Sequence, residues 1–421
     1  MITLLKKVLV YEVHKFGGAS IGSLERIKNT IDIIKSFRSD SKIIIFSAMG
    51  KVTNMLEEII ISSYKGEIFF NQFEKMKNYH YSLIDKFYLR ECDLLSEIDL
   101  LFEELKKTLK NKSDNYQLYY DQNVVYGELI STKIMSILLD LENFDNQLID
   151  ARDIIMTDDN YCNAKINWTK TKRKIIKYFK KKNIITQGFI GSDENYSTTL
   201  GREGSDFTAA IISNCLEIKK LTIWKDVPGL MNCDPKIFKN SIQFKEVPYD
   251  EVIELAHYGA KVIHPRTIKP LKEKNINLII RSFENLKSEG TSVFNHSSII
   301  PMVPSVILKK NQVLISVSNA DLSLFQQKNF NEVLEQANDL GINLNIVQSS
   351  AISCSFTIDQ NFSSEIFLKK LEKKLKVNYN NNLSLVTIRH YNQQIVKNVI
   401  LERKIYLQQK SRNTVSFVLK F

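Results

Sequence analysis

The sequence is poor in the side chains that most often bind metals or form covalent intermediates. Its 421 residues include only five cysteines and six histidines. The cysteines form no Cys-x-x-Cys pair, which excludes the common zinc and redox motifs and fits a reducing compartment. They lie at Cys92, Cys162, Cys215, Cys233 and Cys354. The histidines show neither metal-ligand spacing nor a nucleophilic triad, so we expect no protein-held metal and no cysteine or histidine nucleophile.

Long apolar runs are also missing. No apolar stretch approaches the roughly 20 residues of a membrane-spanning helix. A short apolar run near the start is interrupted by Glu12, His14 and Lys15, which excludes a signal peptide. The rest of the composition is ordinary, with 43% hydrophobic and 25% charged residues. We therefore expect a cytoplasmic globular protein of two or three domains that has no membrane partner.

Acidic residues are fewer than basic ones. Lysine and arginine total 58 against 47 aspartate and glutamate residues, which gives a formal net charge of +11. Such a surplus suits anionic partners such as nucleotides, nucleic acid or acidic lipids. However, the densest basic run, residues 170–182, is interleaved with Ile175, Ile176 and Phe179, a pattern typical of a surface helix with a solvated face. We therefore expect no nucleic-acid partner.

Short apolar runs alternate with helical patterns up to about Val293. Apolar residues between Leu24 and Ile34 recur on one face of a predicted helix. The run Ile43–Phe46 suits a strand that is buried on both faces. Further strands are predicted at Val8–Val13, Ile184–Ile190, Leu221–Trp224 and Ile276–Ile280. This alternation predicts an α/β fold with a mostly parallel sheet sandwiched by helices.

The pattern changes after Val293. Pro301 and Pro304 bracket a predicted linker. Beyond them, strands and helices are expected in the order β-α-β-β-α, which is typical of a ferredoxin-like α+β domain, and more strands follow. We predict a larger domain at residues 1–295 and a region at 296–421 that holds one full and one reduced module, interleaved.

Two glycine-containing turns follow the first two predicted strands. Gly17 and Gly18 let the backbone approach a ligand, and Lys15 adds a positive charge at the same place. After the second strand, Ser47 and Thr53 lie where ligands gather in open α/β sheets. Gly-Gly is often only a turn, and the hydroxyl groups could instead cap a helix, so neither motif is specific alone.

A more specific pattern surrounds Arg202. An arginine flanked by glycines cannot be explained as core, and its guanidinium suits bidentate binding of a carboxylate. Ser205 or Asp206 is predicted to cap a helix at Phe207–Cys215. In a helical stretch farther upstream, Glu128 could pair with an ammonium group, although most helical glutamates are solvated.

Three further lysines stand in turn-rich segments. Lys225, Lys236 and Lys261 could all meet a polyphosphate. The Pro-Gly and Asp-Pro pairs beside them are turn formers, so each segment alone could mark only a loop. We interpret the nearby His264 as structural.

Taken together, these motifs resemble those of the aspartate kinases of the amino-acid-kinase superfamily. In order they are Lys15–Gly18 (KFGG), Gly127–Glu128 (GE), Gly201–Asp206 (GREGSD), Trp224–Gly229 (WKDVPG), Asp234–Lys236 (DPK) and Tyr258–Pro265 (YGAKVIHP). The resemblance is strong over residues 8–293. The tail is more loosely similar to ACT domains, which are regulatory modules that bind amino acids and pair into dimers. Several motifs in register are far more specific than any one of them.

The resemblance implies phosphorylation of the side-chain carboxylate of L-aspartate by ATP with Mg²⁺. The product would be 4-phospho-L-aspartate, the first intermediate towards lysine, threonine and methionine. The residues implied for ATP are Lys15, Phe16, Gly17, Gly18, Ser47, Lys225, Asp226, Met231, Lys236 and Lys261. Those implied for aspartate are Ser47, Thr53, Glu128, Arg202 and Ser205. As catalytic residues, Lys15 would stabilise the transferring group and Asp206 would orient the site or a metal-bound water.

The resemblance also implies a homodimer that pairs through the ACT-like region, with an effector near Ser349 and Ser350. The chain departs from the family's pattern in the catalytic part. Ala19 stands in place of threonine, Glu203 where glycine is common, and Lys236 in place of a frequent arginine. The last change turns a bidentate phosphate contact into a point charge.

Other interpretations remain open. Another kinase of the same superfamily could act on acetylglutamate, glutamate, carbamate or a nucleoside monophosphate, although Glu128 and the ACT-like tail argue against it. A non-catalytic amino-acid sensor could use the same scaffold, although Lys15, Arg202, Asp206 and Lys261 are all retained. We expect no fused homoserine dehydrogenase, because the sequence contains no GxGxxG motif.

Overall fold

The computed structural model describes most of the chain. The described ranges are residues 11–37, 41–85, 94–180, 183–238, 240–260, 262–321 and 323–420. The chain forms two compact units. Unit 1 comprises Met1–Leu230, Gln243–Ile253 and Val262–Ile300, and unit 2 comprises Met231–Ile242, Glu254–Lys261 and Pro301–Phe421. The domain division expected between residues 295 and 296 stays a prediction.

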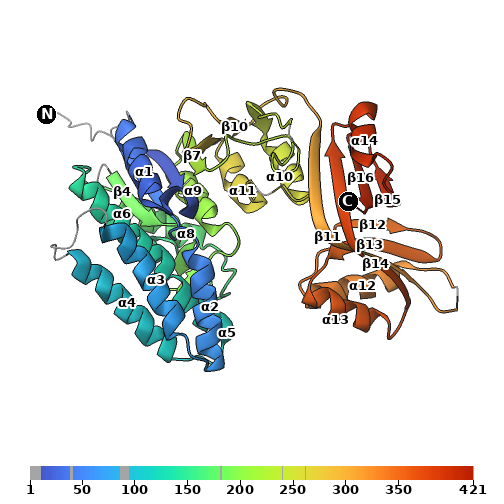
Figure 1. Cartoon of the computed structure of the whole chain (residues 1–421), viewed down its shortest axis with the longest axis horizontal. Coiled ribbons are helices and arrows are strands. Elements are labelled where there is room, and N and C mark those ends of the chain that lie inside the picture. Colours follow the sequence, from blue (N-terminus) through green and yellow to red (C-terminus); the bar gives the residue numbers. More distant parts are fainter. Residues whose placement is uncertain are drawn as a thin grey trace. The chain divides into compact units, whose positions relative to one another are not determined.

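Unit 1 is built on an eight-stranded sheet with the strand order β3-β4-β2-β1-β7-β9-β10-β8. The strands are β1 (Glu12–Phe16), β2 (Lys42–Phe46), β3 (Gln147–Ile149), β4 (Asn183–Gln187), β7 (Lys220–Lys225), β8 (Glu246–Pro248), β9 (Asn277–Ser282) and β10 (Thr291–Phe294). All neighbours are parallel except β9 and β10. Strand β2 is buried along its whole length, as expected in a parallel sheet covered on both faces. The predicted α/β fold is therefore confirmed (Figure 1).

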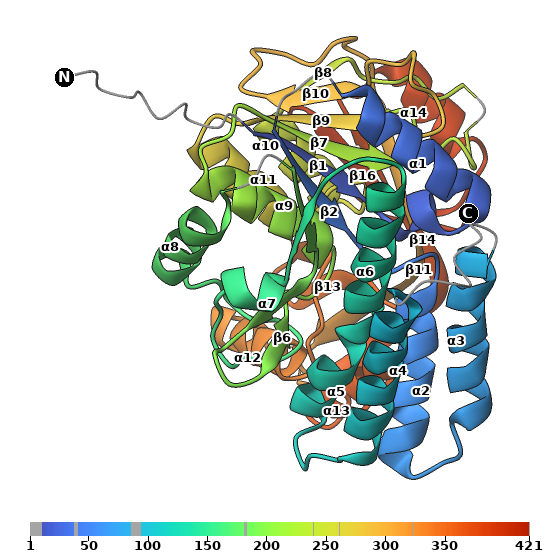
Figure 2. The same ribbon diagram turned by 90° about the vertical axis from the view of Figure 1, so that its left-hand side faces the viewer.

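Helices cover this sheet and extend beyond it. They are η1 (Gly18–Ile21, a 3-10 helix), α1 (Leu24–Ser36), α2 (Val52–Lys65), α3 (Phe70–Ile84), α4 (Leu94–Lys110), α5 (Tyr116–Val124), α6 (Tyr126–Leu141), α7 (Ala151–Ile154), α8 (Trp168–Tyr178), α9 (Gly204–Cys215) and α11 (Pro265–Glu273). Helix α10 (Tyr249–His257) begins in unit 1, and its residues from Glu254 onward belong to unit 2. Helix α6 packs against β2, β3 and β4, while α9 packs against β1, β2 and β7. Helices α2, α4 and α5 pack on one another, and α2 and α4 also pack on α6, to form a bundle (Figure 2). A separate hairpin joins β5 (Ile190–Ser192) to β6 (Ser197–Thr199).

The start of the chain differs from the prediction. Strand β1 ends at Phe16 rather than at Val13, so Lys15 lies within the strand and not after it. The rest of the strand predicted there, residues 8–10, lies outside the described ranges. Behind the glycines the backbone forms the short helix η1, and α1 begins only at Leu24. An α-helix N-terminus therefore does not follow the glycine pair directly.

Two other predictions can be compared with the described elements. The strand predicted to continue to Ile190 ends at Gln187, because Phe189 adopts a left-handed φ of 71°. Residues 170–178 of the basic run lie in the surface helix α8 (Trp168–Tyr178), with Ile175 buried and Ile176 55% exposed, while residues 181–182 lie outside the described ranges.

Unit 2 contains a six-stranded sheet with the order β12-β13-β11-β14-β16-β15. Its elements are β11 (Ser305–Ser318), α12 (Gln327–Asp339), β12 (Ile346–Ser349), β13 (Ser353–Asp359), α13 (Phe362–Leu371), β14 (Lys376–Arg389), α14 (Gln393–Ile400), β15 (Ile405–Lys410) and β16 (Thr414–Leu419). The predicted β-α-β-β-α order is present from β11 to α13, around a core that includes Ile315, Phe356 and Phe367. A second core includes Val386 and Phe417.

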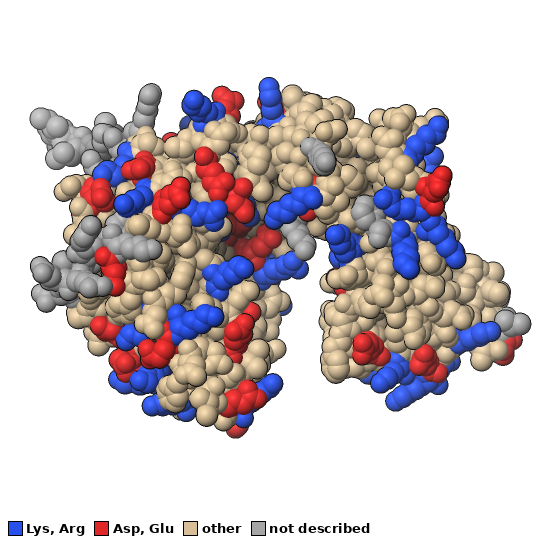
Figure 3. All heavy atoms as spheres, viewed as in Figure 1, with Lys and Arg blue, Asp and Glu red and all other residues tan. Residues whose placement is uncertain are grey.

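The surface carries both signs of charge. On the face seen in Figure 3, lysine and arginine side chains are interspersed with acidic ones, and no single basic patch dominates that face. Of the helices within the described ranges, none combines the length and the apolar character needed to cross a membrane.

Candidate active site

Four parallel strands of unit 1 end at the same edge of the sheet. Strands β4, β2, β1 and β7 are adjacent in that order. Lys15 is the last residue but one of β1, and Lys225 ends β7. Ser47 and Gly188 follow β2 and β4 directly. Because ligands of open α/β sheets bind outside the carboxyl ends of strands, this edge is the candidate site.

A buried carboxylate joins the two lysines at this edge. Asp206, in the first turn of α9, is 2% exposed. The Lys15 Nζ atom lies 2.7 Å from Asp206 Oδ1, and Lys225 Nζ donates a hydrogen bond to Asp206 Oδ2 at 2.9 Å. The Lys225 ammonium group also donates to the carbonyl oxygen of Val262 at 2.7 Å. The structure thus brings together three of the predicted residues from β1, α9 and β7.

The two ammonium groups determine the ionisation of Asp206. Burial alone would raise the pKa of this carboxyl group, because burial disfavours the charged form. The charges of Lys15 and Lys225 outweigh burial and hold the pKa of Asp206 at about 2. Burial also opposes the charge on Lys225, but the nearby Asp206 keeps the pKa of that lysine raised. Two positive charges therefore surround one negative charge, and the cluster attracts an anion.

The turn after β1 lies against the turn after β2. Gly50 N donates a hydrogen bond to the carbonyl oxygen of Gly18 at 3.0 Å. A Cβ atom on Gly18 would lie 2.4 Å from the carbonyl oxygen of Ala48 and 2.9 Å from that of Gly50. A Cβ atom on Gly17 would approach only the Lys15 ammonium group, at 3.4 Å. Close packing therefore requires glycine at position 18, but not at position 17.

Gly18→Ala will push the two turns apart and destabilise the protein. Because the obstacle is backbone that cannot rotate away, we expect the free energy of unfolding to fall by roughly 1–3 kcal/mol. Gly17→Ala is the matched control and should lose less, since only a flexible ammonium group faces the new methyl. Urea denaturation of both variants measures the difference. Equal losses would contradict the close approach of the two turns.

Glu128 is buried beside the second turn. It lies in the first turn of α6, is 3% exposed, and accepts a hydrogen bond from Ala48 N on its Oε1 at 3.3 Å. Its Oε2 has no hydrogen-bond partner among the described residues. Burial raises the pKa of Glu128 to about 8, although the Ala48 amide and the charge of Lys15 oppose this rise. A buried carboxyl oxygen without a partner is costly, so Glu128 is a strong candidate for contact with a ligand.

Glu128→Gln will remove a pH dependence from folding. The unfolded carboxyl group has an ordinary pKa of 4.5, whereas the folded one holds its proton up to a pKa of about 8. The stability of the wild type should therefore fall as the pH rises from 4.5 to about 8, and level off above it. Glutamine cannot ionise, so the Tm of the variant minus that of the wild type should rise across this range. A constant difference in matched buffers would contradict the raised pKa.

The segment before α9 differs from the prediction. Helix α9 begins at Gly204, and its N-cap residue is Glu203, with a left-handed φ of 54°. Ser205 and Asp206 therefore lie within the first turn and do not cap the helix, because the chain turns earlier than predicted. A left-handed conformation costs a non-glycine residue roughly 1–2 kcal/mol, so the local geometry would favour glycine where this chain has Glu203.

The remaining residues predicted for aspartate lie around this edge. Arg202 is exposed at the turn before α9, while Ser205 is buried. Ser205 packs so closely on Gly188 that a Cβ atom on the glycine would lie 2.4 Å from the serine Cβ. Ser47 and Thr53 are half-buried. All four predicted residues belong to unit 1, as Glu128 does.

The residues of unit 1 that were predicted to bind the nucleotide differ in how exposed their side chains are. The ring of Phe16 is fully buried and stacks on the rings of Trp224 and Phe46, so this side chain belongs to the core. Asp226 is exposed directly after β7. Only the backbone of Phe16 could therefore face a nucleotide.

Five predicted residues are not part of the unit 1 site as described. Met231 and Lys236 belong to unit 2, and Lys261 lies outside the described residues. Ser349 and Ser350 are exposed in unit 2, where Ser349 ends β12 and Ser350 begins the connection to β13.

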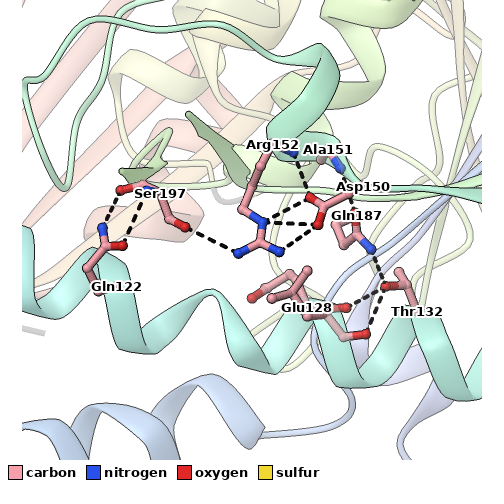
Figure 4. Close-up of polar contacts among 9 residues, drawn as sticks. Gln122, Glu128, Thr132, Asp150, Ala151, Arg152, Gln187 and Ser197 are labelled. Atoms are coloured by element: carbon pink, nitrogen blue, oxygen red, sulfur yellow. Dashed lines mark hydrogen bonds and ion pairs between the residues drawn. The ribbon is translucent and has the colours of Figure 1, made fainter. Parts of the chain in front are cut away.

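Polar side chains that the sequence did not single out lie near Glu128 (Figure 4). Arg152, in α7, forms an ion pair with Asp150, its Nη2 lying 2.6 Å from Asp150 Oδ2. Gln187, at the end of β4, donates a hydrogen bond to Thr132 Oγ1 of α6 at 2.8 Å. The bond from Gln187 ties the helix that carries Glu128 to the edge of the sheet. No glycine turn or regular spacing marks them, so no sequence signal could have found them.

Comparison with family models identifies the chain. The model of the amino acid kinase family matches residues 11–282, which is more than half of the chain. The chain belongs to the amino acid kinase family. This amino acid kinase is 30% identical over 375 residues to "Aspartokinase 1, chloroplastic" of Arabidopsis thaliana, a match that covers 86% of this chain and 66% of that protein.

Other relatives are similar over different shares of their length. The amino acid kinase is 27% identical over 392 residues to "Lysine-sensitive aspartokinase 3" of Escherichia coli, which covers 89% of this chain and 86% of that one. It is 31% identical over 310 residues to a bifunctional aspartokinase/homoserine dehydrogenase of Daucus carota. The chain spans 66% of the Arabidopsis relative but only 33% of the Daucus protein.

Solved structures support the fold of both units. E. coli aspartokinase III in complex with aspartate and ADP matches with a TM-score of 0.82 and 24% identity, covering 97% of this chain and 96% of that one. At this identity the likeness shows the fold alone. It confirms for this amino acid kinase the predicted combination of a mostly parallel α/β sheet with C-terminal α+β modules.

Proposed function

We propose that this amino acid kinase transfers the γ-phosphoryl group of ATP to the side-chain carboxylate of L-aspartate. The product is 4-phospho-L-aspartate, the first intermediate towards lysine, threonine and methionine. One observation carries the proposal: the cationic cluster of Lys15, Asp206 and Lys225 and the buried Glu128 lie at the same edge of one sheet. The aspartokinase relatives described above support it.

The chemistry needs charge neutralisation more than proton transfer. The acceptor carboxylate of aspartate, with an ordinary pKa of about 3.9, is already ionised at neutral pH and needs no general base. The difficulty is that this anion must approach a triphosphate. Phosphoryl transfer of this kind depends on alignment and on positive charge at the equatorial oxygens. In the proposal, Lys15 meets the transferring group, and Gly17 and Gly18 admit the phosphates to the backbone.

Asp206 and Lys225 support Lys15 in this scheme. Asp206 is ionised at neutral pH because of its lysine partners. Its carboxylate therefore holds two ammonium groups 2.7 and 2.9 Å from its oxygens, in place before the nucleotide arrives. Such preorganised charge costs no rearrangement during the reaction. Asp226, Ser47 and the backbone of Phe16 complete the proposed nucleotide set of unit 1, while the roles of Met231, Lys236 and Lys261 stay predictions.

The amino acid would be held through its α-substituents. Glu128 would accept its ammonium group, since one buried carboxyl oxygen lacks a partner among the described residues. Arg202 would bind its α-carboxylate as a bidentate fork. Ser47, Thr53 and Ser205 would donate hydroxyl hydrogen bonds. The side-chain carboxylate would then point towards Lys15.

Mg²⁺ would be held mainly by the nucleotide. Within the described ranges no group of three or more histidine, cysteine, aspartate or glutamate side chains could hold a metal ion. A magnesium ion bound to ATP commonly keeps several waters and uses few protein ligands. Asp206 would orient one of those waters, and the ion would neutralise phosphate charge.

An acyl-hydroxamate assay tests the proposal. Incubation with ATP, Mg²⁺, aspartate and hydroxylamine should produce aspartyl hydroxamate, while glutamate, acetylglutamate, carbamate and UMP should give little ATP turnover. A preference for another acceptor would assign the chain to a different kinase of the family. No turnover with any acceptor would instead indicate a non-catalytic sensor.

Unit 2 would pair two copies of the chain. Strand β14 pairs with β11 along both of its halves, but with β16 only over Ser384–Arg389. The other half of β14 therefore presents an edge, with Tyr379 46% exposed. An open edge is a template for a strand of a second molecule. Light scattering should give twice the chain mass, and a monomer at micromolar concentration would contradict this.

The proposed effector site lies near Ser349 and Ser350. Both residues are exposed, and the Ser350 amide pairs with the Ser353 carbonyl oxygen at 2.8 Å in a tight hairpin. We propose an amino-acid effector there, either lysine or threonine. Repeating the hydroxamate assay with each amino acid added would distinguish them, and unchanged rates with both would exclude such regulation.

A further inference from the structure

Two consecutive side chains at the end of α5 bind the edge of β6. Asp121 accepts hydrogen bonds from Thr199 N at 2.9 Å, Thr199 Oγ1 at 2.7 Å and Cys162 N at 2.9 Å. Its side chain is completely buried. Each of these three donors would lose its hydrogen bond if it moved away from the carboxylate. A buried donor without a partner costs free energy, so Asp121 fixes the positions of Thr199 and Cys162.

Gln122 binds the same strand at Ser197, two residues before Thr199. Its Nε2 donates to the carbonyl oxygen of Ser197 at 2.8 Å, and its Oε1 accepts from Ser197 N at 3.3 Å (Figure 4). The amide group thus pairs with one residue's N–H and C=O as a neighbouring strand would. Together, Asp121 and Gln122 hold β6 at Ser197 and Thr199.

The end of β6 and the residue that follows it are held tightly as well. The carbonyl oxygen of Thr199 accepts from Ala164 N at 2.9 Å, and Leu200 N donates to the carbonyl oxygen of Phe189 at 2.9 Å. Arg266 Nη1 donates to the carbonyl oxygen of Leu200 at 2.9 Å. Little freedom therefore remains in the chain before the next turn.

That turn carries Arg202. Gly201 has a left-handed φ of 72°, and a Cβ atom there would lie 3.1 Å from Cys162 O. Cys162 is the residue whose N–H group binds Asp121. Asp121 thus constrains both the strand that leads into the turn and the loop that packs against it.

The same helix leads into the segment that carries Glu128. Helix α5 ends at Val124, and α6 begins at Tyr126, so only Val125 separates them. Glu128 lies in the first turn of α6. The hydrogen bonds from the end of α5 therefore connect the two predicted anchors of the amino acid, Glu128 and Arg202, through a short and well-packed path.

We propose that Asp121 and Gln122 are positioning residues that set the place of Arg202 relative to Glu128. Neither residue would touch the substrate. They would keep Glu128 and Arg202 far enough apart for one to bind the ammonium group and the other the α-carboxylate of the same aspartate molecule. The side-chain carboxylate of that aspartate would then reach Lys15. The inference rests on the proposed function, because it concerns the amino-acid half of that site.

The test compares Asp121→Ala with a control on the same hairpin. The substitution removes the acceptor of all three hydrogen bonds, so the clamp on Thr199 and Cys162 is lost. We expect the KM for aspartate to rise roughly tenfold, with kcat and the KM for ATP changed less than about threefold. Asp193→Ala is the control: Asp193 also accepts three hydrogen bonds, from Asn195 N, Tyr196 N and Tyr161 Oη, but at the far turn of the hairpin.

The outcomes separate the inference from the function on which it rests. If the wild type makes no aspartyl hydroxamate, the proposed function fails. If the wild type is active and Asp121→Ala leaves the KM for aspartate unchanged, or lowers kcat alone, the inference is overturned. An equal rise in Asp193→Ala would also overturn it, since the effect would then be general to the hairpin.

A milder variant covers the case in which Asp121→Ala does not fold. Gln122→Ala removes both hydrogen bonds to Ser197 without burying a mismatched group. A threefold or greater rise in the KM for aspartate, with thermal unfolding close to that of the wild type, would support the inference. An unchanged KM in this folded variant would overturn it.

Discussion

Replacing Lys15 by alanine will lower kcat for aspartate phosphorylation by roughly 10²- to 10³-fold. Lys15 Nζ lies 2.7 Å from a buried carboxylate at the carboxyl edge of the sheet, so its charge is fixed in place. Its removal deletes positive charge where the transferring phosphoryl group needs it most. Asp206 keeps Lys225 as a partner, so we expect the variant to fold, with a lowered Tm. The measurement is kcat at saturating ATP and aspartate.

Lys220→Ala is the matched control for this effect. Lys220 begins β7, at the opposite end of the strand that Lys225 ends, and its ammonium group lies 3.9 Å from the carboxylate of Glu12. Its removal changes the net charge by the same amount but should leave kcat within twofold of the wild type, as expected for an exposed pair. A normal kcat in Lys15→Ala, or an equal loss in both variants, would refute the role of Lys15.

Glu128→Gln will raise the KM for aspartate by roughly 10- to 100-fold and leave the KM for ATP almost unchanged. The reason is the loss of a charge-assisted hydrogen bond to the substrate ammonium group in a buried site. Glutamine keeps the size of the side chain and an oxygen for Ala48 N, so the fold should survive. Equal rises in both KM values would argue that Glu128 does not touch the amino acid.

The pH dependence of binding sharpens this second prediction. In the free protein the pKa of Glu128 is about 8, so the carboxyl group is mostly protonated at neutral pH. Only the ionised form attracts an ammonium group, and a proton must therefore leave on binding. The affinity of the wild type for aspartate should rise with pH up to about 8 and then level off. Calorimetry should show no such rise in Glu128→Gln.

The spacing of apolar residues predicted the elements in which one apolar pattern runs through the whole helix or strand. The run Ile43–Phe46 is apolar throughout because β2 is buried on both faces, and the structure confirms it as a strand. The start of α9 could not be predicted in the same way. Glu203 adopts a left-handed φ that glycine would favour, so the side chains after it looked like caps although they lie inside the helix.

The candidate site was predictable where glycine turns and charges mark it. Lys15, Asp206 and Lys225 were each singled out, but their mutual ion pairs depend on how β1, α9 and β7 pack. Asp121 and Gln122 were missed, because polar residues on a helix usually face solvent. Their role depends on contacts with β6, which lies more than seventy residues later in the chain.

A crystal structure with ADP and aspartate bound tests the central claim most directly. We predict that the aspartate ammonium group lies on Glu128, that its α-carboxylate lies on Arg202, and that its side-chain carboxylate faces the ammonium group of Lys15 beside the nucleotide phosphates. Arg202 remote from Lys15, with no cavity shared between them, would contradict it.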